Sequence, residues 1–266
     1  MPKFGLGTWR MGENARKRRD EVGALRHGID LGVTLIDTAE MYGDGEAEAI
    51  VADAAGSDRD RLFIVSKVLP ENASRRGAIA ACERSLKRLK TDRIDLYLLH
   101  WRGSPPLSET LEAFSALRAA GKIIDWGVSN FDLSDMQELA RLSPDEAPAT
   151  NQVLYNLTRR GIEFDLVPWC RERHIPIMAY SPIEQGRMLN HPALKSVAQR
   201  REATPAQVAL AWLLRQDGII AIPKAGSRAH VEEDIAALGV TLDRDDLATL
   251  DRAFPPPTKA RPLEML

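Results

Sequence analysis

Four side chains that can carry or exchange charge follow consecutive apolar runs of the sequence. The run LID ends in Asp37, and Tyr42 follows five residues later. The run FIVSK ends in Lys67, and the run IDLYLLH ends in His100. Parallel strands place their carboxyl ends at one rim of a sheet or barrel, which is where such proteins bind ligands. We therefore expect these four side chains to converge at one site.

Together the four groups could protonate an oxygen atom that gains negative charge. A free phenol has a pKa near ~10, which is too high for ready proton exchange at neutral pH. A lysine cation about 4 Å away would favour the phenolate by about 4 kcal/mol, more than the ~2.7 kcal/mol that a shift of two pKa units requires. We therefore expect Lys67 to lower the pKa of Tyr42, with Asp37 as counterion for Lys67. A neutral His100 could donate a hydrogen bond to a substrate oxygen, so the set suits reduction of a carbonyl group.

Each of these residues also has an ordinary structural interpretation. An aspartate at the end of a strand often caps a turn, a lysine there is often a rim charge, and a single histidine is more often structural than catalytic. A second chemistry also stays open, because a lysine at the end of a barrel strand can form a Schiff base, and Lys67 could then serve a lyase.

Composition limits the class of protein. The chain has 266 residues, of which 44% are hydrophobic, and a net charge of −2, which gives no overall basic field for nucleic acid. Cys82 and Cys170 lie far apart in an otherwise cysteine-poor chain, which suits a reducing compartment. No apolar run reaches membrane-spanning length, and the first residues do not resemble a signal peptide. We expect a cytoplasmic protein with a small-molecule substrate, no membrane or nucleic-acid partner and no metal.

Strand and helix patterns alternate along the whole sequence. Strands are expected at 4–9, 34–37, 63–67, 94–100, 123–129, 149–153, 177–180 and 219–222. Helices are expected after each strand, among them 16–31, 75–89, 107–120, 134–142, 165–173, 204–215, 229–238 and 244–253. This alternation favours a (β/α)8 TIM barrel in the α/β class, formed as a single domain over residues 1–266. No G-x-G-x-x-G motif follows a strand, so a Rossmann nucleotide site has no support.

The sequence resembles the aldo-keto reductase family over almost its whole length, and among its branches it resembles bacterial methylglyoxal-reductase-like members most. The resemblance rests on ordered motifs at family-like spacing: GLGTW at 5–9, LIDTAEMYG at 35–43, SK at 66–67, DLYLLHW at 95–101, GVSN at 127–130, NQ at 151–152, YSP at 180–182 and IPK at 222–224. It implies that the family's catalytic tetrad falls on Asp37, Tyr42, Lys67 and His100.

The resemblance also implies an extended NADPH, with NADH as a second possibility. It assigns the nicotinamide to Ser129, Asn130, Gln152 and Tyr180, and the pyrophosphate path to Ser181, Pro182, Ile183, Gln185 and Gly186. It assigns the adenosine phosphate to Lys224, Ser227 and Arg228, and the adenine to Glu233. His230 and Asp234 depart from the family pattern, since many members have an arginine on the 2′-phosphate and an asparagine on the adenine there.

Further expectations concern the substrate and the partners. Trp9, Met41, Trp101 and Phe131 would wall a pocket for small aldehydes, ketones or dicarbonyls such as methylglyoxal. The amino-terminal hairpin that commonly plugs the bottom of the family's barrel is absent or shortened here. The carboxy-terminal loop that sets substrate choice in larger relatives is also short, which implies an open, permissive pocket. The family default is a monomer. The resemblance leaves one non-enzymatic alternative, a cofactor-binding subunit that reports redox state to a protein partner.

Overall fold

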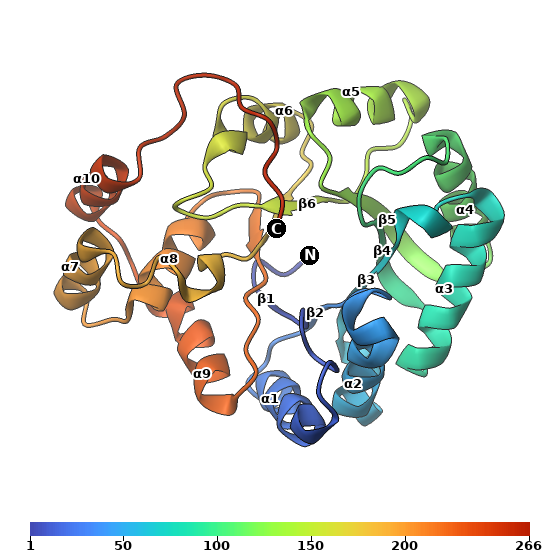
Figure 1. Ribbon diagram of the computed structural model, residues 1–266, viewed down its shortest axis with the longest axis horizontal. Coiled ribbons are helices and arrows are strands. Elements are labelled where there is room, and N and C mark those ends of the chain that lie inside the picture. The colour runs from blue at the N-terminus through green and yellow to red at the C-terminus, as the bar shows by residue number, and fades with distance from the viewer.

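The computed structural model describes all of residues 1–266, and its centre is a ring of eight parallel strands (Figure 1). Each strand pairs with the next in sequence order, and the bridges Phe4 to Ala221 and Gly7 to Lys224 bring the last strand region against the first. The strands are β1 (Gly5–Gly7), β2 (Leu35–Asp37), β3 (Phe63–Val68), β4 (Ile94–Leu99), β5 (Ile123–Ser129), β6 (Asn151–Leu154), β7 (Ile177–Tyr180) and β8 (Ile219–Ala221). The predicted (β/α)8 barrel is confirmed.

Ten α-helices surround the strands (Figure 1). They are α1 (Arg18–Asp30), α2 (Glu46–Ala55), α3 (Arg75–Leu89), α4 (Leu107–Ala119), α5 (Leu133–Leu142), α6 (Leu166–Glu172), α7 (Pro192–Arg200), α8 (Pro205–Leu214), α9 (Arg228–Ala236) and α10 (Arg244–Ala253). The predicted helices are all present, with ends that differ by no more than two residues. The segment between β7 and α8 contains the further helix α7.

Local capping explains several of the helix starts. Thr204 and Gln207 form a reciprocal capping box at the start of α8, and Asp243 and Asp246 form another at the start of α10. In each box a side-chain oxygen accepts from a backbone N–H that lacks a partner within the helix. The helix ends are thus specified by polar residues that interrupt the apolar pattern.

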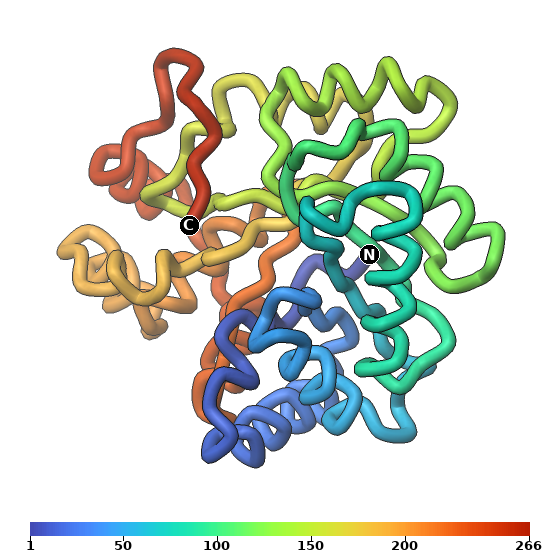
Figure 2. The backbone as a smooth tube through the Cα atoms, turned by 45° about the vertical axis from the view of Figure 1, so that its right-hand side comes forward, coloured from blue at the N-terminus to red at the C-terminus, as the bar shows by residue number.

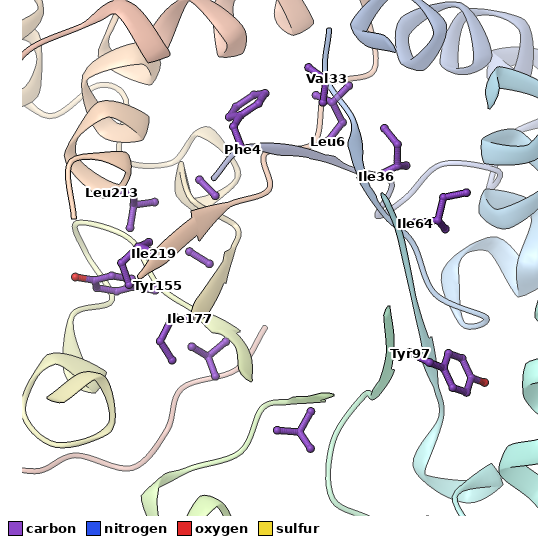
Figure 3. Packing of buried hydrophobic residues seen from close by; sticks show 14 of the residues in the cluster. Phe4, Leu6, Val33, Ile36, Ile64, Tyr97, Tyr155, Ile177, Leu213 and Ile219 are labelled. Carbon is purple, nitrogen blue, oxygen red and sulfur yellow. The ribbon is translucent and has the colours of Figure 1, made fainter. Parts of the chain in front are cut away.

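The hydrophobic core has two layers, one outside and one inside the strand ring. The outer layer fills the space between strands and helices, and Figure 3 shows Leu6, Ile36, Ile64 and Tyr97 pointing away from neighbouring strands into it. The inner layer consists of Leu35, Val65, Leu96, Leu98, Met178, Ile220 and Ile222. The barrel interior is therefore a packed core that closes the floor of any site at its mouth.

The carboxy-terminal segment returns from α10 to the barrel (Figures 1 and 2). Glu264 in this segment accepts a hydrogen bond from Arg159 at 2.5 Å, and Arg159 also binds Glu184. Met265 and Leu266 end beside the barrel mouth. No helix of the structure is both long enough and apolar enough to cross a membrane.

Candidate active site

The two-residue period of the strands brings three of the four candidate side chains to the barrel mouth. Leu35, Val65 and Leu98 lie in the inner core layer. The residue two positions further along each strand points the same way, and these residues are Asp37, Lys67 and His100. The three charged or polar groups therefore cap the apolar interior, and all three are buried.

Tyr42 reaches the same point from the turn after β2. It begins the short 3-10 helix Tyr42–Gly45, in which Gly43 has φ +56°. A Cβ atom on Gly43 would lie 2.9 Å from the carbonyl oxygen of Met11, so this turn requires glycine. The turn aims the phenol at Lys67, whose Nζ donates to the Tyr42 hydroxyl at 3.3 Å.

Lys67 is the centre of the cluster. Its Nζ lies 2.8 and 2.9 Å from the two carboxylate oxygens of Asp37, and it donates to the carbonyl oxygen of Thr38 at 2.8 Å. The Lys67 side chain is fully buried, and that of Asp37 nearly so. Gln152 Nε2 donates to Asp37 Oδ1 at 2.8 Å, so this oxygen is shared between Gln152 and Lys67. The cation thus has the counterion that the sequence predicted.

The electrostatics of Tyr42 differ from the expectation. Desolvation raises the pKa of Tyr42 well above its ordinary value, and the Asp37 carboxylate raises it further. The expectation that Lys67 lowers the pKa of Tyr42 was wrong. Asp37 balances the lysine charge, so burial of the phenol sets the direction of the shift. Burial also lowers the pKa of Lys67, against the opposing effect of Asp37. The phenol is therefore a protonated hydrogen-bond donor at neutral pH.

His100 is neutral, as expected. Burial lowers the pKa of His100 to about 2, with a smaller contribution from the Lys67 charge. Its Nδ1 is buried and has no hydrogen-bond partner in the protein. The ring lies edge-on to Tyr42, with centroids 5.8 Å apart, and stacks obliquely on Trp101 at 4.7 Å. A neutral imidazole and a neutral phenol therefore stand side by side at the rim.

A cavity of about 640 Å³ opens over this cluster, within the range that binds small molecules and cofactors. Three of the four expected catalytic residues line it: Asp37, Tyr42 and His100. Lys67 lies beneath them. Most expected cofactor and substrate residues line it as well: Trp9, Met41, Trp101, Ser129, Asn130, Gln152, Tyr180, Ser181, Pro182, Ile183, Gln185, Gly186, Lys224 and Glu233.

Three expected residues lie elsewhere. Phe131 is fully buried in the outer core, so the expectation that it walls a substrate pocket was wrong. Ser227 caps α9, with its hydroxyl accepting from the backbone of His230, and it does not line the cavity. Arg228 is exposed on the first turn of α9 and extends toward Gly23 of α1. Neither residue contacts the cavity in this structure.

Polar groups near the tetrad form one connected set. Tyr180 donates from its hydroxyl to Asn130 Oδ1 at 3.0 Å, and Asn130 Nδ2 donates to the carbonyl oxygen of His100 at 3.0 Å. Asn130 adopts φ +57°, a conformation that asparagine tolerates better than most residues. The ring of Tyr180 thus has a fixed position at the cavity wall, where it could stack on a planar ligand.

The remaining length of the cavity suits an elongated anionic ligand. Ser181, Glu184 and Gln185 all have positive φ values, so the strip after β7 follows an irregular path, and the Ser181 hydroxyl is buried without a partner. At the far end Lys224 lines the cavity near the start of α9, and helix starts favour anions. These groups could hold a dinucleotide cofactor that extends from Tyr180 to Lys224.

Sequence reasoning missed several lining residues. Arg10 lines the cavity with φ +63° and stacks on Trp9, its guanidinium carbon 4.4 Å from the ring centroid. Arg10 directly follows Trp9, which was expected to line the pocket, and that position could have suggested a role for Arg10. Met265 and Leu266 line the cavity through the return of the carboxy-terminal segment, for which the sequence contains no periodic pattern.

Comparisons with known proteins agree with this geometry. A profile described as the aldo/keto reductase family matches residues 3–254. The chain is 51% identical to methylglyoxal reductase YeaE of Escherichia coli (strain K12), over all of this chain and 95% of that protein. It is 35% identical to glyoxal reductase of Bacillus subtilis (strain 168), over 94% of this chain and 88% of that one. A crystal structure of an aldo-keto reductase from Klebsiella pneumoniae in complex with NADPH superposes with a TM-score of 0.98 at 52% identity, covering all of this chain and 95% of that chain.

Proposed function

This chain belongs to the aldo/keto reductase family, and we propose that it is an NADPH-dependent carbonyl reductase that converts small aldehydes, ketones or dicarbonyls such as methylglyoxal into alcohols. Two observations outside the site support the proposal. Its relatives include proteins named methylglyoxal reductase and glyoxal reductase. A solved structure with a nearly identical fold was crystallised with NADPH.

The observation that carries the proposal is the Lys67 cluster beneath the cavity. A protonated Tyr42 and a neutral His100 face the cavity, while Lys67 holds Tyr42 from below and Asp37 holds Lys67. Tyr42 and His100 can both donate hydrogen bonds to a carbonyl oxygen, and such donors stabilise the negative charge that this oxygen gains during reduction. The ammonium of Lys67, 3.3 Å from the Tyr42 hydroxyl, would stabilise the phenolate that remains after Tyr42 has given up its proton.

The chemistry is divided between the cofactor and the chain. When bound, NADPH supplies the hydride that reduces the carbonyl carbon. His100 and Tyr42 orient the carbonyl by hydrogen bonds to its oxygen. Tyr42 transfers its phenolic proton to that oxygen as it becomes an alkoxide, a much stronger base than a phenolate, so the raised pKa of Tyr42 does not prevent transfer. Lys67, held by Asp37, stabilises the phenolate until solvent returns the proton.

The cavity residues fit the cofactor along its length. Ser129, Asn130 and Gln152 offer hydrogen-bonding groups for a carboxamide beside the tetrad, and Tyr180 offers a ring face. The buried Ser181 hydroxyl has no protein partner and is available to a ligand oxygen. At the far end the ammonium of Lys224 suits the additional phosphate of NADPH, which supports a preference for NADPH over NADH.

The substrate end of the cavity is open and largely aromatic. Trp9 and Trp101 are partly exposed, and Met41 is 40% exposed. These apolar walls, with Tyr42 and His100 as the polar corner, suit compact substrates that need no extended polar recognition.

The same geometry disfavours a Schiff base on Lys67. Its Nζ already contacts Asp37, Thr38 and Tyr42, and it does not line the cavity. A carbonyl substrate would have to displace a buried ion pair to reach this nitrogen, which costs several kcal/mol. The reductase is therefore the favoured chemistry for this site.

The test is NADPH oxidation, followed at 340 nm, by the purified protein with methylglyoxal, with 4-nitrobenzaldehyde and NADH in parallel reactions. We expect turnover with NADPH and slower turnover with NADH. Tight NADPH binding without turnover of any carbonyl substrate would contradict the proposal and favour a redox-reporting subunit.

A further inference from the structure

A buried carboxyl group without a partner lines the cavity on the side formed by α9. Asp234, in the second turn of α9, lines the cavity together with Lys224, His230 and Glu233. Asp234 is only 4% exposed, yet no hydrogen bond or ion pair within the protein reaches its carboxyl group. A buried carboxylate without a partner is unfavourable, so the group must either be neutral or find its partner in a ligand.

We propose that Asp234 binds the adenine ring of the cofactor as a neutral carboxyl group, so that cofactor binding takes up one proton. This inference rests on the proposed function. In the proposed function the reacting nicotinamide lies against Tyr42 and His100, and the ammonium of Lys224, which lines the same cavity, suits the 2′-phosphate. The adenine is attached to the ribose that carries this phosphate. We therefore expect the adenine to lie beside α9, where Asp234 can contact it.

The hydrogen-bonding pattern of adenine selects the protonated form. One edge of adenine presents an amine donor beside a ring-nitrogen acceptor, and an amide side chain matches both groups. A carboxylate can only accept, so it would face the ring nitrogen with a repulsive lone pair. A neutral carboxyl group carries one donor and one acceptor, and it therefore matches adenine as an amide does.

The surroundings of Asp234 favour that form. Burial raises the pKa of Asp234 to about 7, and the neighbouring Glu233 carboxylate raises it further. Lys224 and Arg10 are cations that line the same cavity, but neither pairs with Asp234.

The elements packed against α9 supply no counterion either. Helix α8 has no titratable side chain, and neither does the 3-10 helix Ala237–Gly239 that follows α9. Helix α1 approaches α9 at Gly23, His27 and Gly28. Its titratable group there, His27, lies 2.7 Å from Glu232 and is thereby occupied. No nearby residue therefore replaces the proton.

The consequence is a pH-dependent affinity. Below pH 7 the carboxyl group is already neutral and binding needs no proton. Above pH 7 binding must restore the proton, so the dissociation constant rises about tenfold for each pH unit. Between pH 6 and pH 8 the NADPH affinity attributable to Asp234 should fall about tenfold, given a pKa of about 7.

The matched variant is Asp234→Asn, which keeps the shape and carries a donor and an acceptor at every pH. NADPH dissociation constants would be measured by fluorescence for both proteins from pH 6 to pH 8.5. Titration of groups that both proteins share, such as the 2′-phosphate of the cofactor, cancels in the ratio of the two constants. We expect similar constants at pH 6 and about tenfold tighter binding by the variant at pH 8. Glu233→Gln should keep the pH dependence but move its midpoint to lower pH.

Calorimetry provides a second measurement that does not depend on the variant's stability. NADPH titrations of the unmodified protein at pH 8, in two buffers of different ionisation enthalpy, should show uptake of about one proton. No proton uptake, or a constant ratio between the two proteins across the pH range, would overturn the role of Asp234 while leaving the reductase proposal intact. No NADPH binding by either protein at any pH would overturn both.

Discussion

Replacing Lys67 by methionine tests the buried ion pair that organises the site. The variant removes a fully buried cation that lies 2.8 and 2.9 Å from the two Asp37 oxygens. It leaves Asp37 with a single side-chain donor, Gln152 Nε2, and removes the side-chain donor to the Thr38 carbonyl. Removing one partner of a buried ion pair costs about 3–5 kcal/mol, because the other charge stays buried and unpaired. We expect the free energy of unfolding to fall by that amount at pH 7.

The double variant separates the charge effect from lost packing. Asp37→Asn alone leaves the Lys67 ammonium without a countercharge, whereas Lys67→Met combined with Asp37→Asn leaves no buried charge at this position. The double variant should therefore be more stable than the sum of the two single losses predicts, by about 2 kcal/mol. Urea unfolding followed by circular dichroism would give the three values. A loss below about 1 kcal/mol for Lys67→Met, or strict additivity, would refute the reasoning.

Two further outcomes follow from the same site. Lys224→Ala should weaken NADPH far more than NADH in fluorescence titrations, because only NADPH carries the phosphate that the ammonium suits, and equal losses would place the phosphate elsewhere. The folded-state pKa of His100 is lowered to about 2, so its contribution to stability is complete above the unfolded pKa of ~6.5 and is lost as the pH falls. Between pH 6.5 and pH 5 the protein should lose about 1.6 kcal/mol more of its unfolding free energy than His100→Asn does, and parallel urea-unfolding profiles would contradict this.

The strand-end residues could be predicted from sequence because the strand period is short and regular. Asp37, Lys67 and His100 each follow an inward-facing apolar residue by two positions, so their convergence depends only on the order of the strands. The position of Tyr42 was also predictable, since it lies in a short glycine-containing turn directly after β2.

Features that depend on three-dimensional balance could not be predicted in the same way. The direction of the Tyr42 pKa shift depends on how burial and Asp37 offset Lys67, which requires distances. Phe131 follows the polar Asn130 at the end of β5, but its side chain turns into the outer core. The return of Met265 and Leu266 to the cavity depends on tertiary contacts such as that between Arg159 and Glu264.

The most direct test of the central claim compares the protein with its Tyr42→Phe variant, measuring NADPH affinity and methylglyoxal reduction on the same preparations. The hydroxyl makes one hydrogen bond in the protein, at 3.3 Å to Lys67, so the fold and the cofactor affinity should change little. Loss of a positioned proton donor should reduce turnover by ~10²-fold or more. A variant that binds NADPH normally and still reduces methylglyoxal at the original rate would contradict the role of Tyr42 as the proton donor.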